Sequence, residues 1–193
     1  ETVLQAVRDA AIDYLGSGMS VMEMSHRSKP IVDLFDTASS RVKDLLDIPS
    51  NYHILWLQGG ASLQFSMVPF NLLSKNGSAD YIDTGSWSFK AVAECNKLGT
   101  GKIIASSRDS NYTFIPKEYE QNHDASYLHI TSNNTIYGTQ YNKIPEVKSV
   151  GGILVADMSS DIFSRSIDIS QFGVIYAGAQ KNIGPAGVTL VII

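Results

Sequence analysis

The chain has 193 residues, of which 44% are hydrophobic and 18% charged, the composition of an ordinary globular protein. That length is enough for one domain with a substantial core. The formal net charge of −4 and the lack of any lysine or arginine run argue against a nucleic-acid partner. A small anionic substrate needs only one or two local arginines and remains compatible with this charge.

The single cysteine, Cys95, excludes an intrachain disulfide and favours a reducing compartment, so we expect a cytoplasmic location. No apolar run approaches the roughly 20 residues that cross a bilayer, and no membrane partner is expected. The chain starts without methionine or the pattern of a signal peptide, and it ends in the apolar run 188–193. Both ends lead us to expect a piece of a longer protein.

The first 50 residues predict two helices. Residues 2–15 place apolar side chains at helical spacing, and the Gly16-Ser17-Gly18 segment stops that pattern. A second apolar stripe covers 31–45, with Pro30 suited to its first turn and Pro49 just beyond its end.

Beyond residue 50, short apolar runs predict buried strands, and helical stretches separate several of them. The predicted strands are 54–57, 127–130, 153–156 and 174–177, and the predicted helices are 62–73 and 87–98. Strands that are apolar on both faces and alternate with helices indicate a sheet covered on both sides. The prediction is a single α/β domain over 1–193, with a mostly parallel central sheet and helices on both faces.

Ligands of such sheets gather where the strands end, and Gly59-Gly60-Ala61-Ser62 is the first candidate segment. Small residues between a strand and a helix let backbone N–H groups approach a phosphate, which the helix dipole favours. The segment matches neither a Walker loop nor a dinucleotide-binding fingerprint. A tight strand-to-helix turn without a ligand explains the same residues.

Asp157 ends the strand predicted at 153–156. A buried carboxylate costs several kcal/mol unless it meets a cation or hydrogen-bond donors. A protonated pyridine nitrogen, as in pyridoxal enzymes, is one such partner. An N-cap of the following turn is the alternative.

Lys181 follows the strand predicted at 174–177 and lies among glycine, alanine and proline residues. Partial desolvation in such a loop would favour the neutral amine, which can form an imine with a carbonyl group. A loop lysine that simply extends into water is the alternative.

Trp87 and the His26-Arg27 pair are less specific signals. An indole at a strand-to-helix junction stacks on a flat ring or packs in the core. An arginine in a loop before a helix grips a carboxylate or phosphate, or is merely solvated. The order of phosphate loop, flat aromatic, Asp157 and Lys181, each after a predicted strand, indicates one joint site. The last two are 24 residues apart (181 − 157), enough for a return to the same sheet edge.

Six segments together resemble successive motifs of the phosphoserine aminotransferases, class-V, fold-type I enzymes that use pyridoxal 5′-phosphate (PLP). They are Met24–Ser28, Gln58–Phe65, Thr84–Ser88, Asn133–Gly138, Ala156–Ser160 and Ala177–Asn182. The resemblance runs from near residue 14 to the end and looks most like the bacillus-type branch. It implies that 1–193 is a portion of the PLP-binding large domain and that the C-terminal small domain is absent.

The resemblance also implies a role for each candidate residue. Lys181 would carry PLP as a Schiff base and shuttle a proton, while Asp157 would pair with the pyridinium nitrogen. The other contacts would be Trp87 on the ring, Thr135 on the ring hydroxyl side, Ala61, Ser62 and Gln180 on the phosphate, and Arg27 with His26 on the substrate's acidic groups. Some family members differ at positions 61 and 62, where backbone donors survive the change.

The reaction implied is reversible transfer of an amino group between glutamate and 3-phosphohydroxypyruvate, giving 2-oxoglutarate and O-phosphoserine in serine biosynthesis. The family acts as a homodimer with a shared active site, and the small domain supplies a further substrate-binding arginine. No metal is implied. Because the partner's contribution and the small domain lie outside this chain, we expect the 193-residue piece alone to bind PLP poorly and to turn over little substrate.

Two other hypotheses remain open. Alanine–glyoxylate-type transaminases and cysteine desulfurases are fold-type I PLP enzymes with a comparable lysine and aspartate, but desulfurases need a mobile cysteine. Cys95 lies in a helical stretch, which does not suit that role. A non-catalytic anion-binding α/β module would use the Gly59-Gly60 segment alone and would bind no PLP.

Overall fold

The computed structural model describes residues 1–193, and its contacts divide them into two compact units, Glu1–Leu45 and Leu46–Ile193. The first unit holds helix α1 (Thr2–Ile12), a short 3-10 helix η1 (Tyr14–Gly16) and nearly all of helix α2 (Lys29–Leu46). Both predicted helices are present. The first is shorter than predicted because Asp13 is extended and Leu15 is left-handed, with φ of 58°.

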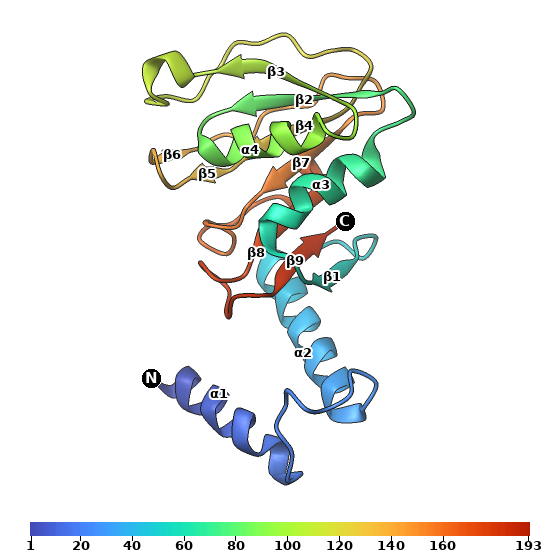
Figure 1. The fold of residues 1–193 in the computed structure, drawn as a ribbon, viewed down its shortest axis with the longest axis vertical. Helices are drawn as coiled ribbons and strands as arrows, with labels where there is room; N and C mark the ends of the chain where they lie inside the picture. The colour runs from blue at the N-terminus through green and yellow to red at the C-terminus, as the bar shows by residue number, and fades with distance from the viewer. The chain divides into compact units, whose positions relative to one another are not determined.

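The second unit is built on a seven-stranded sheet with the order β1-β9-β8-β7-β4-β2-β3 (Figure 1). Its strands are β1 (Ile54–Leu57), β2 (Ser78–Asp83), β3 (Thr100–Ser106), β4 (Ala125–Thr131), β7 (Ile153–Asp157), β8 (Val174–Gly178) and β9 (Thr189–Ile192). Strand β9 runs antiparallel to both of its neighbours, β1 and β8, and all other adjacent strands of this sheet are parallel. The prediction of a mostly parallel sheet is confirmed.

The smaller elements lie in the connections. Strands β5 (Asn133–Asn134) and β6 (Thr139–Gln140) form a two-stranded antiparallel hairpin after β4. Short 3-10 helices occupy Arg108–Ser110 (η2) and Ile169–Gln171 (η3).

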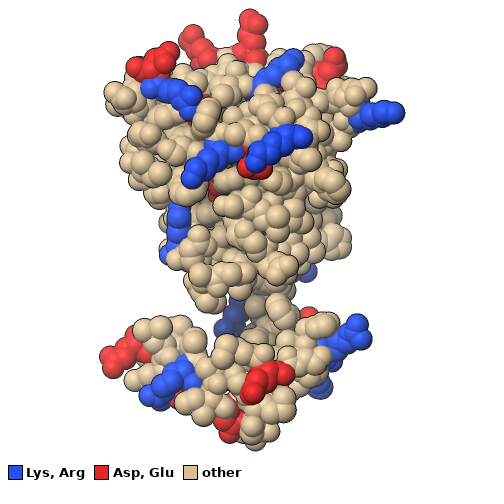
Figure 2. All heavy atoms as spheres, viewed as in Figure 1, with Lys and Arg blue, Asp and Glu red and all other residues tan.

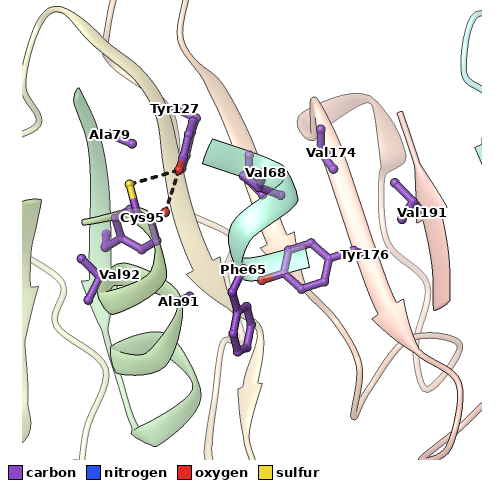
Figure 3. Close-up of a cluster of buried hydrophobic side chains, with 12 residues drawn as sticks. Phe65, Val68, Ala79, Ala91, Val92, Cys95, Tyr127, Val174, Tyr176 and Val191 are labelled. Carbon is purple, nitrogen blue, oxygen red and sulfur yellow. Dashed lines mark hydrogen bonds between the residues drawn. The ribbon is translucent and has the colours of Figure 1, made fainter. Parts of the chain in front are cut away.

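Helices α3 (Gly60–Leu72) and α4 (Ser86–Cys95) pack against each other and against the sheet. Figure 3 shows their apolar side chains meeting those of the strands in one buried cluster. Phe65 of α3 meets Tyr176 of β8 edge-on, with ring centroids 6.2 Å apart. The Tyr127 hydroxyl bonds to the Tyr81 hydroxyl at 2.6 Å, so the buried polar tips of this cluster are paired.

The central strands are buried on both faces. In β4, Tyr127 and Leu128 point to opposite faces, and neither is accessible to solvent. Leu154 and Val155 repeat this pattern in β7. Burial on both faces explains why these strands are continuous apolar runs in the sequence.

Strands β2 and β3 of this sheet are not predicted by the apolar pattern of the sequence. Asp80 lies within β2 and Asp83 ends it, so the strand is not a continuous apolar run, although both side chains are buried. Strand β3 is at the edge of the sheet, all of its residues are exposed or half-buried, and its apolar run is limited to 103–105. Neither strand has the composition that marks a buried strand.

The surface agrees with the charge pattern of the sequence. On the face drawn in Figure 2, basic side chains are scattered among acidic ones and do not gather in one patch. None of the helices combines the length and apolar character that a bilayer span requires.

Candidate active site

The carboxyl ends of the parallel strands bring several predicted residues to one edge of the sheet. The register pairs Asp157, the last residue of β7, with Thr131 of β4 and Tyr176 of β8. Lys181 follows closely on the end of β8, and its charge acts on the Asp157 carboxyl group. Asp157 and Lys181 therefore lie at the same edge, which is the arrangement that the sequence hypothesis requires.

Asp157 is only 5% exposed, and only one oxygen of its side chain is hydrogen-bonded within the chain. Oδ1 accepts hydrogen bonds from Ser159 N at 2.9 Å and Ser159 Oγ at 2.6 Å, whereas Oδ2 has no partner within the chain. Burial raises the pKa of Asp157, while the bonds from Ser159 and the positive charge of Lys181 oppose that rise. Oδ2 is thus available to a donor or cation from outside the chain.

The loop that carries Lys181 is anchored on both sides of this residue. Ala179 N donates to Val188 O at 2.9 Å, and Asn182 Nδ2 donates to Ile162 O at 2.6 Å. The Lys181 side chain is exposed, and its Nζ lies 5.3 Å from the centroid of the Trp87 ring. The desolvation suggested by the sequence is therefore not supplied by residues of this chain.

Trp87 lies in the first turn of α4, and its ring is half-buried. Its backbone N–H donates to Asn134 Oδ1 at 3.3 Å, and a Cβ on Gly85 would come within 2.5 Å of the same side chain. Lys90 Nζ lies 4.6 Å from the centroid of the Trp87 ring. The indole Nε1 is buried without a hydrogen-bond partner within the chain.

A buried aspartate that sequence reasoning missed supports the turn before Trp87. Asp83 Oδ1 lies 3.0 Å from Ser88 Oγ, which itself accepts hydrogen bonds from the backbone N–H groups of Thr84 and Gly85. Oδ2 accepts from Ser106 Oγ at 2.9 Å and Tyr112 OH at 3.0 Å. The signal in the sequence is the same as for Asp157, an aspartate at the end of a strand.

The Gly59-Gly60 segment forms the beginning of α3. Both glycines are left-handed, with φ of 92° and 64°, and no side chain caps the helix. The first turn of an α-helix has backbone N–H groups without intrahelical partners, here those of Gly60, Ala61 and Ser62. Together with the helix dipole, these groups are suitable donors for a phosphate, and the phosphate site at Ala61 and Ser62 stays a prediction.

The remaining predicted residues are placed as follows. Thr135 is exposed in the turn between β5 and β6, which Gly138 N closes on Asn134 O at 2.9 Å. Gln180 is exposed beside Lys181. His26 and Arg27 are exposed and belong to the first unit, and their substrate role stays a prediction.

The unpaired polar atoms at this edge suit one kind of ligand. Thr131 Oγ1, beside Asp157, is buried without a partner, as is Trp87 Nε1. With Asp157 Oδ2, the Lys181 amine and the open end of α3, they fit a flat heterocycle that carries a basic ring nitrogen, an aldehyde and a phosphate. The chain groups this chemistry at one edge of its sheet.

A cavity of about 300 Å³ lies near this edge but is separate from it. Its lining residues are Ser86, Phe89, Lys90, Arg108, Asn111, Tyr112 and Tyr137. None of the residues predicted for the site contributes to it. The cavity is therefore distinct from the candidate site at the Asp157–Lys181 edge.

Comparison with known proteins gives the family. The model of the class-V aminotransferases matches residues 1–193. The chain belongs to the class-V aminotransferase family. Its relatives in that family include the phosphoserine aminotransferase of Desulfosudis oleivorans, 53% identical over 193 residues, which are 100% of this chain and 53% of the relative.

Solved structures of this family match the fold. The phosphoserine aminotransferase of Bacillus circulans subsp. alkalophilus has a TM-score of 0.94 and 47% identity, over 100% of this chain and 53% of that one. The PLP-bound phosphoserine aminotransferase of Trichomonas vaginalis has a TM-score of 0.92 and 38% identity, over 100% and 57%. This class-V aminotransferase chain thus spans about half the length of the relatives that it matches.

Proposed function

We propose that the whole protein is a PLP-dependent phosphoserine aminotransferase, which exchanges an amino group between glutamate and 3-phosphohydroxypyruvate in serine biosynthesis. The products are 2-oxoglutarate and O-phosphoserine. The observation that carries the proposal is 53% identity, along the entire chain, to a protein of that name. The Asp157–Lys181 edge supplies the chemistry that such a reaction needs.

Bound PLP supplies a ring that withdraws electron density from the α-carbon of the substrate. Lys181 would hold the cofactor through its Nζ, and the same nitrogen would carry a proton to and from the substrate. Asp157 Oδ2 pairs with the ring nitrogen and keeps its positive charge in place. Trp87 covers one face of the ring and keeps water from it.

The phosphate is held at the beginning of α3. The backbone N–H groups of Ala61 and Ser62 point out of its first turn, and Gln180 adds a side-chain donor. Thr135 holds the ring hydroxyl side. His26 and Arg27 bind the acidic groups of the substrate, and the enzyme acts in the cytoplasm as a homodimer whose two subunits complete each site.

The two competing hypotheses are less well supported. Cys95 is 0% exposed inside α4, where its Sγ lies 3.6 Å from the Tyr127 hydroxyl, so it cannot act as the mobile nucleophile of a desulfurase. A non-catalytic anion-binding module would not explain why a largely buried carboxylate, Asp157, has one oxygen without a partner. Relatives that are 50–53% identical are named phosphoserine aminotransferases, whereas an alanine–glyoxylate aminotransferase of solved structure is only 13% identical.

The test uses borohydride reduction and peptide mapping of the full-length protein with PLP. We expect the pyridoxyl group on Lys181, and a Lys181→Ala variant that loses both this product and the absorbance near about 400–430 nm of the bound cofactor. Lys90→Ala is the matched control, because its amine also lies by the Trp87 ring, and it should keep the product. A pyridoxyl group on another lysine would refute the assignment, and so would its absence from the wild-type protein.

A further inference from the structure

Ser159 connects the proposed ring-binding carboxylate to the strand that leads to Lys181. It lies two residues beyond Asp157 and is only 7% exposed. Its backbone N–H and its hydroxyl both donate to Asp157 Oδ1, at 2.9 and 2.6 Å. Two donors on one oxygen fix the plane of the carboxylate and leave Oδ2 as the only oxygen without a partner.

The hydroxyl of Ser159 has a second bond that sets its direction. Its Oγ accepts a hydrogen bond from Gly178 N at 3.0 Å. A hydroxyl group has one proton, and the N–H of Gly178 occupies a lone pair, so the proton is left for Asp157. Gly178 is the last residue of β8, from which the chain continues into the loop with Lys181.

The two bonds also act on the charge of the carboxylate. Burial alone would favour the protonated form of Asp157, which cannot pair with a ring cation. The hydrogen bonds from Ser159 stabilise the carboxylate and are the largest influence opposing that effect. The ammonium charge of Lys181 acts in the same direction, and the nearby Asp161 acts against it.

We infer that Ser159 is a positioning residue that acts through Asp157, holding its carboxylate turned so that Oδ2 meets the ring nitrogen of the cofactor. The inference rests on the proposed function and extends it by one residue for which the family resemblance implied no role. Ser159 touches neither cofactor nor substrate in this role. Its effect depends on the ring nitrogen, because that atom is the partner of Asp157.

A purely structural role is the competing explanation, since Ser159 also joins the ends of β7 and β8. The two explanations differ in how they depend on the ring nitrogen. A structural link would affect any cofactor of the same shape. A role through Asp157 would disappear for a PLP analogue in which a C–H group replaces that nitrogen, because no charge is left to pair with.

The experiment measures the dissociation constants of PLP and of this carbon analogue for the full-length apoenzyme, by titration with absorbance or fluorescence detection. We expect Ser159→Ala to weaken PLP binding about tenfold, the lower end for loss of a hydrogen bond to a charged group, and to change analogue binding by less than about twofold. Ser159→Thr keeps the hydroxyl and should restore most of the PLP affinity. Ser160→Ala is the matched control, because the Ser160 hydroxyl bonds to Asn133 O and not to Asp157, and it should bind both compounds as the wild type does.

If Ser159→Ala does not fold, Ser159→Cys provides the same comparison, since a thiol of similar size is a weaker donor. Equal losses for PLP and the analogue would overturn the inference in favour of a structural role, and so would unchanged PLP binding. These results are distinct from failure of the proposed function. In that case the wild-type protein would bind no PLP, whatever residue 159 is.

Discussion

Two strands of the sheet, β2 and β7, end in a buried aspartate, and the surroundings give the two side chains different roles. Both oxygens of Asp83 have partners, namely the hydroxyl groups of Ser88, Ser106 and Tyr112. Asp157 has partners on Oδ1 alone. A carboxylate with partners on both oxygens stabilises the fold, whereas the free oxygen of Asp157 is available to the ligand that we propose for this edge.

His129 shows a third use of a buried polar side chain. It is 1% exposed, its Nε2 bonds to the Tyr176 hydroxyl at 2.8 Å, and its ring stacks on Tyr81 with centroids 4.9 Å apart. Burial lowers its pKa from 6.5 to about 3, because the charged imidazolium would lose its hydration. The residue is therefore neutral in the folded protein at every pH near neutrality.

This shift predicts a specific acid sensitivity. Between pH 6.5 and 3 the unfolded chain binds a proton at His129 that the folded protein does not, so acidification favours unfolding. From pH 7 to pH 5 this contribution is about 2 kcal/mol of unfolding free energy. In His129→Gln, which keeps a polar partner for Tyr176, the free energy of unfolding from urea titrations should fall by about 2 kcal/mol less than in the wild type over that interval.

The control for this measurement is His53→Gln, because His53 is exposed. It should show the pH dependence of the wild type. The explanation is wrong if His129→Gln loses as much stability on acidification as the wild type does.

Among the elements, helix α3 depends most on its first residues. The left-handed Gly59 leads the chain from β1 into the helix, and Leu63 N donates back to Gly59 O at 3.3 Å. A Cβ on Gly59 would lie 2.4 Å from Leu63 Cδ2. The substituted residue would also have to adopt the left-handed φ of 92°. The N–H groups proposed to hold the phosphate thus depend on a residue without a side chain.

We predict that Gly59→Ala in the full-length protein lowers the free energy of unfolding by about 1–2 kcal/mol and weakens PLP binding. The clash with Leu63 displaces the first turn of α3, and its donors move away from the phosphate. Gly151→Ala is the control that has backbone strain without a clash, because Gly151 has φ of 70° and nothing lies within 4 Å of a Cβ built there. It should be destabilised without a change in PLP affinity, and equal effects of the two variants on PLP binding would contradict this account.

At the scale of the whole molecule, the chain provides part of the proposed active site. Asp157, Lys181 and Trp87 belong to the second unit, whereas His26 and Arg27 belong to the first. The chain spans about half the length of the relatives that it matches. On the proposed function, the rest of the protein and a second subunit supply the other substrate and phosphate contacts.

We therefore predict that residues 1–193 alone bind PLP weakly and catalyse amino transfer at least about 100-fold more slowly than the full-length protein, because the missing contacts no longer orient the substrate. The measurement compares the PLP dissociation constant and the transamination rate of the two proteins at equal concentration. Full-length Lys181→Ala provides the background rate. Turnover by the short chain close to that of the full-length protein would overturn this prediction.

Much of the fold could be predicted because a buried strand or helix face requires apolar residues at a regular spacing within a short segment. Strand β1 occupies the predicted residues 54–57, although Leu55 is exposed, and β4, β7 and β8 include their predicted runs, since these three strands are almost entirely buried. Helix α2 begins beside Pro30 as expected. The run 188–193 contains β9, but its antiparallel direction depends on pairing with β1 and β8, which the run does not reveal.

The amino-acid sequence was sufficient for the α/β class and for the family resemblance, and it nominated Asp157 and Lys181, because each of these rests on patterns within short segments. The folded structure was needed to distinguish the saturated Asp83 from the half-free Asp157 and to reveal the link from Ser159 to Gly178. The partners of a polar atom come from segments far apart in the chain, such as Trp87 and Asn134, which are 47 residues apart. Periodicity records which faces are buried, but only the folded chain determines which atoms meet there.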